Sequence, residues 1–157
     1  GVGKSTLLRA IAGRLPPESG HIHCHLPCVY IGHADGLAGV ISGRKNLRSW
    51  AAIYDIDVTD TIINQALTGF DVLELADIPI QILSRGQRRR LALARLLLAP
   101  VQSLWLLDEP NAGLDTKSQA RLDSVISQHL KSGGAVIAAT HIALAASTTT
   151  LNLELGS

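Results

Sequence analysis

The sequence predicts an α/β fold built around a parallel β-sheet. Short apolar segments typical of buried strands alternate with segments of helical periodicity, which is the pattern of parallel strands joined by crossover helices. A length of 157 residues corresponds to one domain, and a hydrophobic content of 46% is enough for a packed core. Aromatic residues make up only 3%, so Leu, Ile, Val and Ala must build most of that core.

Each element of this alternation has its own local signal. The first helix begins within GVGKST, runs to about Gly13 and is stopped by Pro16-Pro17. Residues 43–82 are predicted to be mostly helical, and one face of the first helix there carries Leu47, Trp50, Ala51 and Tyr54. The expected strands are CVYIGH (28–33), SLWLL (103–107), AVIAA (135–139) and TTTLNLEL (148–155).

Two further helices complete the pattern. One covers about residues 85–98 and stops at Pro100, and the other covers residues 116–131 and ends at Gly133-Gly134. The side chains expected to face inward from the second are Leu122, Val125, Ile126, His129 and Leu130.

Charge and composition argue against several classes of protein. A net charge of +1 provides no general field for nucleic acid, so no nucleic-acid partner is expected. Two cysteines form no disulfide framework and fit a reducing compartment. Residues 132–153 carry no Lys, Arg, Asp or Glu, but glycines, His141, Asn152 and many Thr and Ser interrupt them. A strand, a turn, a short helix and a strand are therefore expected there, rather than a membrane span.

The first six residues, GVGKST, are the closing half of a phosphate-binding loop. Gly3 lets the backbone approach a phosphate, Lys4 reaches the β- and γ-phosphates, and the Ser5 hydroxyl can hold Mg²⁺. The helix that follows directs its positive end at the phosphates. The predicted nucleotide-binding residues here are Gly1, Gly3, Lys4, Ser5 and Thr6.

Another part of the motif is expected before the first residue. The first glycine of the motif would lie three residues before Gly1, and the chain contains no Met. We therefore expect the sequence to be a fragment that continues N-terminally.

A second motif, which is acidic, follows the predicted strand SLWLL. The strand ends in Asp108 and Glu109, at the sheet edge where α/β proteins bind their ligands. Asp108 can support a Mg²⁺ ion, and Glu109 can polarise a water molecule for attack on a γ-phosphate. An acidic turn after a strand is common, but the phosphate loop upstream favours the catalytic interpretation.

LSRGQ, residues 83–87, lies between the phosphate loop and LLDEP, and it resembles the LSGGQ signature of ATP-binding cassette (ABC) ATPases. Arg85 stands where the family usually has a small residue. The resemblance covers essentially the whole chain. It implies that Ser84, Gly86 and Gln87 act on the ATP bound by the opposite subunit of a head-to-tail homodimer. It also implies that NAGLD, residues 111–115, crosses the dimer interface.

The same resemblance assigns two histidines. His141, after AVIAA and Thr140, is similar to the switch histidine that contacts the γ-phosphate. His33 occupies the position of the family's Q-loop glutamine. Its context, YIGHADGL, resembles the CcmA subfamily, the ATPase subunits of the haem exporter complex in c-type cytochrome maturation. Lys45 and Asn111 depart from the usual residues of that subfamily, Glu and Phe.

The family implies a P-loop NTPase (RecA-like) core, residues 1–41 and 83–157, with an inserted α-helical subdomain at about 42–82. The N-terminal continuation would supply antiparallel strands and an aromatic residue that stacks on adenine. The implied activity is Mg²⁺-dependent ATP hydrolysis that drives an integral, CcmB-like membrane subunit, docked near His33 and the helical segment. The subunit would lie peripherally on the cytoplasmic face of the inner membrane. Alternatives are the ATPase of another small export system, or a non-transport ABC protein.

Two clusters of residues invite other functions. In HIHCHLPC, residues 21–28, a strand would place the histidines and Cys24 on opposite faces, so a variable strand-loop is expected rather than a metal or haem site. Arginines in the signature helix wrap around more than one face, and we expect them to be solvated or interface charges. These are Arg85, Arg88, Arg89, Arg90 and Arg95.

Overall fold

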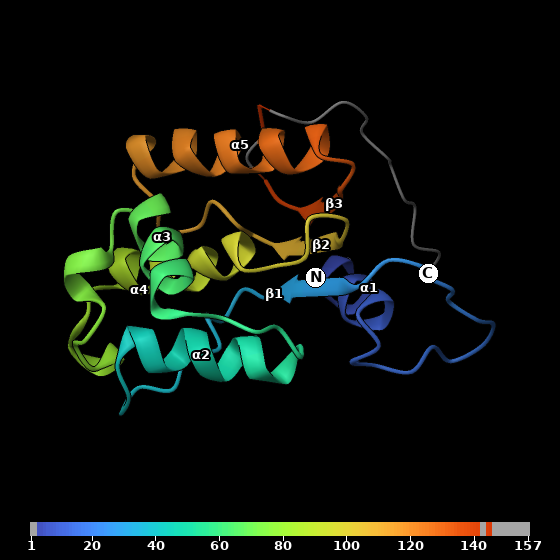
Figure 1. Cartoon of the computed structure of the whole chain (residues 1–157). Helices are drawn as coiled ribbons and strands as arrows, with labels where there is room; N and C mark the ends of the chain where they lie inside the picture. The colour runs from blue at the N-terminus through green and yellow to red at the C-terminus, as the bar shows by residue number, and fades with distance from the viewer. Residues whose placement is uncertain (1–2, 142–143, 146–157) are drawn as a thin grey trace.

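The computed structural model describes residues 3–141 and 144–145, and a parallel sheet lies at their centre (Figure 1). Within these residues the sheet has the strand order β1–β2–β3. The strands are β1 (Cys28–Ile31), β2 (Leu104–Asp108) and β3 (Ala135–Ala139). Each strand pairs in parallel with its neighbour, so the carboxyl ends of all three meet at one edge. The predicted parallel α/β architecture is confirmed.

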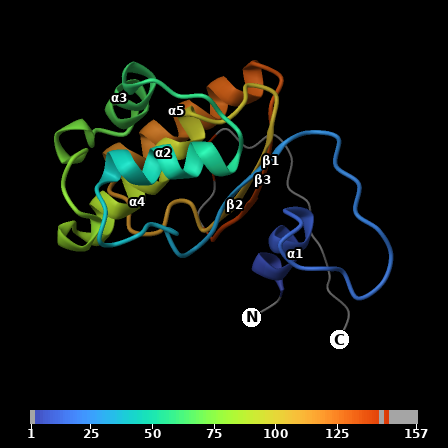
Figure 2. The ribbon, with the colours of Figure 1, turned by 60° about the horizontal axis from the view of Figure 1, so that its bottom comes forward.

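Helices cover both faces of this sheet. They are α1 (Lys4–Ile11), α2 (Gly43–Ile53), α3 (Asp60–Gly69), α4 (Arg85–Leu93) and α5 (Thr116–Lys131), with short 3₁₀ turns η1 (Leu73–Leu75), η2 (Ile80–Ile82) and η3 (Ala94–Leu97). Figures 1 and 2 show α1 on one face and α2 to α5 on the other. The expected helix over 85–98 is present as α4 and η3, and the expected strand at 28–33 is shorter, because Gly32 and His33 lie in the loop after β1.

The two faces of the sheet carry separate apolar cores, because side chains alternate along each strand. Val29, Ile31, Trp105 and Leu107 face the large core under α2 to α5. Leu104 and Leu106 face a small core that contains Leu8 of α1. α1 therefore packs on a smaller apolar core than the other helices.

The predicted inward faces of α2 and α5 are confirmed. Leu47, Trp50 and Ala51 are buried on α2, and Leu122, Ile126 and His129 are buried on α5. The His129 ring stacks on Trp105 with centroids 3.6 Å apart, and its Nε2 lies 3.0 Å from the Ser103 carbonyl oxygen. Burial of the imidazole lowers the pKa of His129.

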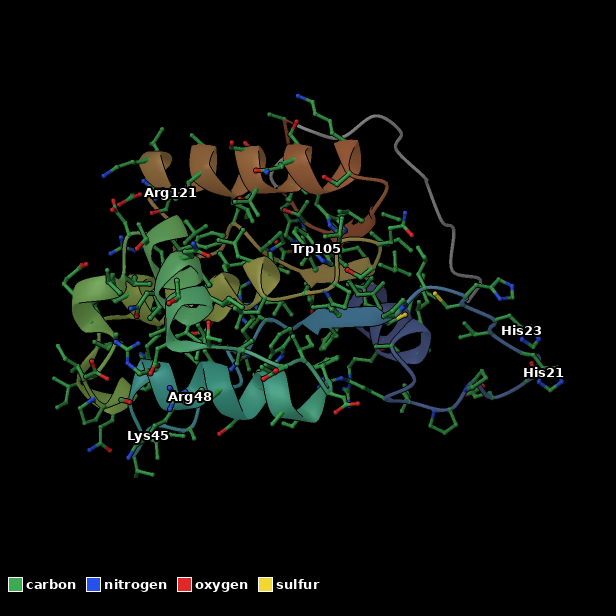
Figure 3. All side chains as sticks on the ribbon, viewed as in Figure 1. His21, His23, Lys45, Arg48, Trp105 and Arg121 are labelled. Carbon is green, nitrogen blue, oxygen red and sulfur yellow. The ribbon has the colours of Figure 1, made fainter. Side chains whose placement is uncertain are left out.

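The loop between α1 and β1 carries the histidine-rich segment, with His21 and His23 at its outer end (Figure 3). His21, His23 and His25 are exposed in irregular structure, and the Cys28 thiol donates to Cys24 Sγ at 3.5 Å. Among the described residues, no group of three or more His, Cys, Asp or Glu side chains could hold a metal ion.

No helix within residues 3–141 and 144–145 is long and apolar enough to cross a membrane. The predicted strand TTTLNLEL and the residue Gly1 lie outside the described residues.

Candidate active site

The predicted phosphate loop leads into α1, whose N-terminus differs from those of the other described α-helices. Side chains cap α2 to α5: Ser42, Thr59, Ser84 and Asp115 each accept a hydrogen bond from a backbone N–H in the first turn. The N-cap of α1 is Gly3, which has no side chain and adopts a φ of 82°. The first backbone N–H groups of α1 are therefore left for an external anion, such as a phosphate.

A pocket of about 560 Å³ lies at this helix end and at the carboxyl edge of the sheet. Its lining residues come from the phosphate loop, the loop after β1, the end of β2 and the segment after β3. They are Gly3, Lys4, Ser5, Thr6, His33, Asp108, Glu109 and His141. The fold thus brings together predicted residues from four separate stretches of the sequence.

Ser5 and Asp108 meet directly in this pocket. The Ser5 hydroxyl donates a hydrogen bond of 3.0 Å to Asp108 Oδ1, across 103 positions of sequence. Asp108 is only 4% exposed. Tyr30 lies close by: burial, together with the charge of Asp108, raises the pKa of its hydroxyl. The pair presents a carboxylate and a hydroxyl oxygen, which are ligand types that Mg²⁺ accepts.

Glu109 is held in an uncommon backbone conformation. Its φ is 48°, in the left-handed region, which costs roughly 1–3 kcal/mol for a residue other than glycine. Its N–H donates to the Ala139 carbonyl at 2.7 Å, next to Asp108 and Ala139, the last pair of the β2–β3 ladder. A backbone held this way aims the Glu109 side chain out of the strand direction and into the pocket.

The carboxylate of Glu109 contacts His141. Oε1 lies 3.2 Å from His141 Nε2, and Oε2 accepts a hydrogen bond of 3.3 Å from the His141 backbone N–H. The His141 side chain is 78% exposed, whereas that of Glu109 is 23% exposed. The exposed imidazole is therefore free to turn towards a bound ligand, while the carboxylate stays in place.

The signature residues lie outside this pocket. Ser84 and Gln87 form a capping box at the start of α4: Ser84 Oγ accepts from the Gln87 N–H, and Gln87 Oε1 accepts from the Ser84 N–H. Ser84 is exposed, and a side chain at Gly86 would lie 3.2 Å from the Gly113 carbonyl oxygen. Within one chain, therefore, Ser84, Gly86 and Gln87 do not reach the phosphate loop.

The expectation that the signature-helix arginines are all solvated or interface charges is wrong for two of them. Arg89 is 3% exposed and Arg95 is 6% exposed. Arg95 donates to the carbonyl oxygens of Asp35 and Gly36, and burial lowers its pKa to about 10. Helical periodicity does not single them out, because Arg88 also lies three or four residues from buried apolar residues of the same stretch, Leu91 and Ala92.

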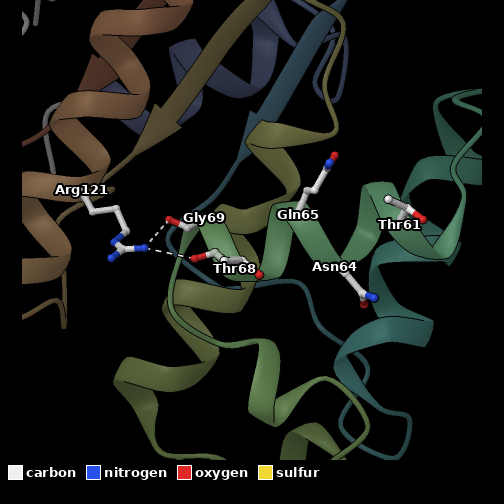
Figure 4. Close-up of a pocket in the computed structure, with 6 residues that line it drawn as sticks. All are labelled: Thr61, Asn64, Gln65, Thr68, Gly69 and Arg121. Carbon is white, nitrogen blue, oxygen red and sulfur yellow. Dashed lines mark hydrogen bonds between the residues drawn. The ribbon is translucent and has the colours of Figure 1, made fainter.

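A second pocket, of about 590 Å³, lies between α3 and α5 and contains none of the predicted site residues (Figure 4). Arg121 of α5 donates there to the carbonyl oxygens of Thr68 and Gly69, at 3.1 and 3.0 Å. These bonds satisfy carbonyl groups at the end of α3, which is a structural role.

Comparisons with known proteins agree with this site. A family model described as ABC transporter matches residues 1–112. A relative from Chelativorans sp. strain BNC1 is 41% identical over 92% of this chain and 75% of its own length, and one from Cereibacter sphaeroides is 45% identical over 92% and 67%. Both are called cytochrome c biogenesis ATP-binding export protein CcmA.

Solved structures give the same fold. An ABC transporter ATP-binding protein from Pyrococcus furiosus is 28% identical and superposes with a TM-score of 0.77, over 91% of this chain and 75% of that one. The dimeric bacterial cassette MJ0796 is 19% identical with a TM-score of 0.79, over 90% of this chain and 71% of that one, and supports the fold alone. The predicted resemblance to ABC ATPases, and to the CcmA subfamily in particular, is confirmed. The chain belongs to the ABC transporter family and is an ATP-hydrolysing member of it.

Proposed function

We propose that this chain is the nucleotide-binding subunit of the haem exporter complex that acts in c-type cytochrome biogenesis. The pocket that joins the phosphate loop to Asp108, Glu109 and His141 carries this proposal, because it brings together groups that can bind phosphate, hold Mg²⁺ and accept a proton from water. The relatives' names, which combine ATP binding, export and cytochrome c biogenesis, support the choice of pathway.

The phosphate loop binds the nucleotide in this proposal. The uncapped N–H groups of α1 and the Lys4 ammonium neutralise the β- and γ-phosphates. Gly1, Gly3 and Thr6 belong to the same loop, and Gly3 with its φ of 82° allows close approach of the backbone. His33, exposed in the loop after β1 and part of the pocket lining, replaces a glutamine as the polar residue near the γ-phosphate.

The Ser5–Asp108 pair fits a Mg²⁺ ion. Both oxygens face the pocket within hydrogen-bond distance of each other, and Mg²⁺ is usually held by one or two protein oxygens together with phosphates and waters. Bound there, Mg²⁺ would neutralise charge on the β- and γ-phosphates. Ser5 and Asp108 would hold it, and the burial of Asp108 would keep its carboxylate oriented.

Glu109 acts as the general base and His141 as the γ-phosphate sensor. The Glu109 carboxylate accepts a proton from the attacking water, and the hydrogen bond that it accepts from the His141 backbone N–H fixes its direction. His141 is exposed enough to turn to the γ-phosphate when ATP is present.

The active form is a head-to-tail homodimer. Ser84, Gly86 and Gln87 cannot serve the pocket of their own chain, and the start of α4 presents them on the surface. In a dimer they would contact the γ-phosphate bound by the partner, with residues 111–115 at the interface. ATP would then close two composite sites, and hydrolysis would open them.

A CcmB-like integral membrane subunit uses this motion. We place its contact near His33 and the helical subdomain, residues 42–82, which is inserted into the core formed by residues 1–41 and 83–157. Internal pairs support this division: Arg44 on α2 forms an ion pair of 2.9 Å with Asp77 and donates to Asn64 on α3. The subunit would be peripheral, on the cytoplasmic face of the inner membrane, with no nucleic-acid partner.

The test uses the protein expressed from its complete reading frame. It should hydrolyse ATP with Mg²⁺ but not with EDTA, and Lys4→Ala should lose nucleotide binding. In bacteria whose own CcmA gene is deleted, the wild-type chain should restore haem-stained c-type cytochromes, and Lys4→Ala should not. ATP hydrolysis without such restoration would indicate that the chain serves another export system or has a non-transport role. Absence of hydrolysis would refute the enzymatic proposal.

A further inference from the structure

Arg89 of α4 is buried at the junction of three segments that are far apart in the sequence. An arginine has five N–H donors and no acceptor, and all five are used here. Nη1 donates to the Gly32 carbonyl oxygen at 2.9 Å and to Asp35 Oδ1 at 3.2 Å. Nη2 donates to the carbonyl oxygens of Glu109 at 2.8 Å and Asp108 at 3.2 Å. Nε donates to the Pro110 carbonyl oxygen at 3.3 Å.

One half of this set fixes the backbone around the general base. Three successive carbonyl groups, from Asp108 to Pro110, point at one guanidinium group. Such convergence requires the chain to turn sharply within these residues, and Glu109 at its centre has the left-handed φ of 48°. A charged donor that binds these carbonyls favours this turn over the extended backbone that would otherwise continue β2.

The other half fixes the loop that carries His33. Gly32 and Asp35 flank that histidine, and the Asp35 carboxylate is the acidic partner of Arg89 among the described residues. Arg95 holds the same loop from its other side through the carbonyl oxygens of Asp35 and Gly36. Of these two arginines, Arg89 is the one that also donates to carbonyl groups of the Asp108–Pro110 turn.

We infer that Arg89 is a positioning residue that couples the His33 loop to the backbone of the general base Glu109. The inference rests on the proposed function, because it gives that function's base its geometry. A shift of the His33 loop must either break the bonds to Gly32 and Asp35 or move the guanidinium, and with it the carbonyl group of Glu109. Arg89 belongs to the helix that begins at Ser84, so the signature helix is part of the same rigid connection.

The test separates coupling from simple stabilisation. Arg89→Gln should leave the affinity for a fluorescent ATP analogue unchanged, because no Arg89 atom contacts the phosphate loop. It should lower kcat about 10- to 100-fold, the loss typical when a partner that orients a catalytic group is removed. Arg89→Lys should restore part of this rate, since it keeps the charge but has three donors in place of five.

The matched control is Arg121→Gln. Arg121 also donates to two backbone carbonyls, on α3, away from the nucleotide pocket. It should lose thermal stability but keep the wild-type kcat. If Arg89→Gln keeps the same kcat as Arg121→Gln, the inference is wrong. If the wild-type protein itself fails to hydrolyse ATP, the proposed function fails instead.

A second variant covers the case in which Arg89→Gln does not fold. Asp35→Ala removes only the partly exposed carboxylate on the loop. Hydrogen–deuterium exchange should then speed up in peptides that contain residues 108–112, more than 70 positions away in sequence, as well as in the loop itself. This readout does not depend on ATPase activity. Faster exchange in the loop alone, with residues 108–112 unchanged, would overturn the coupling.

Discussion

Substitution of Glu109 by Gln is the most direct test of the candidate active site. Gln has nearly the same size and removes only the charge and the ability to accept a proton. Its amide oxygen can still accept the hydrogen bond that the His141 N–H donates to Oε2. The backbone turn at Glu109 is fixed by its own N–H, which donates to the Ala139 carbonyl, and by its own carbonyl, which accepts from the Arg89 guanidinium; the substitution leaves both bonds in place.

The two effects of this change differ greatly in size. The contact between Glu109 and His141 involves a side chain that is 78% exposed, and exposed pairs of this kind contribute about 0.2–1 kcal/mol to stability. Loss of a positioned general base lowers the rate about 10²- to 10⁴-fold. At about 1.4 kcal/mol per tenfold, this is roughly 3–5 kcal/mol of the activation barrier. The variant should therefore be folded and almost inactive.

The assay combines phosphate release at saturating ATP, binding of a fluorescent ATP analogue and gel filtration with ATP. The variant should bind nucleotide as the wild-type protein does, turn over very slowly, and elute as an ATP-dependent dimer, since hydrolysis no longer opens the composite sites. Turnover close to that of the wild type would remove Glu109 from its role as base. A parallel loss of nucleotide binding would show instead that the carboxylate supports the binding site.

Two further predictions concern the signature and the core. Ser84→Asp keeps a good N-cap for α4 but places a negative charge where the partner's γ-phosphate is expected. Thermal stability should therefore be unchanged, while ATP-dependent dimerisation and turnover are lost. An active variant would contradict the action of Ser84 across the dimer. Burial lowers the pKa of His129 below its ordinary value of 6.5, so the unfolded chain binds more protons than the folded chain. The melting temperature should then be highest above pH 6.5 and fall as the pH is lowered from 7 towards 5, and His129→Phe should flatten this dependence; equal slopes for the two proteins would contradict it.

The architecture and most of the pocket follow from local sequence signals. Apolar spacing placed α2 and α5 with the correct buried faces, and the end of β2 placed Asp108 and Glu109 at the carboxyl edge of the sheet. Parallel strands bring such residues together whatever the length of the connections between them. The shared pocket of Lys4, Ser5, Asp108 and Glu109 could therefore be predicted without knowledge of side-chain contacts, whereas His141 is assigned through the family resemblance.

The arginines could not be assigned in the same way. A guanidinium group is buried when carbonyl groups from other segments converge on it, and that convergence depends on the folded chain rather than on the neighbouring residues. Arg89 finds its acceptors 19 to 57 positions away. The side chain of its neighbour Arg88 makes no hydrogen bond or ion pair within the part of the chain that the structure describes, although both belong to the same run of three arginines.

The contrast between α1 and the other helices links stability to function. α2 to α5 begin at side-chain N-caps and pack on the large core, whereas α1 begins at an uncapped glycine and packs on the small one. Free N–H groups at a helix start destabilise the helix unless a ligand satisfies them. A bound phosphate would supply that partner, and the stability of the folded state would then rise with the logarithm of the ligand concentration above the dissociation constant. The helix that binds the nucleotide is thus also a helix that the bound phosphate would stabilise. The 3.0 Å hydrogen bond from Ser5 on α1 to Asp108 links this helix to the end of β2.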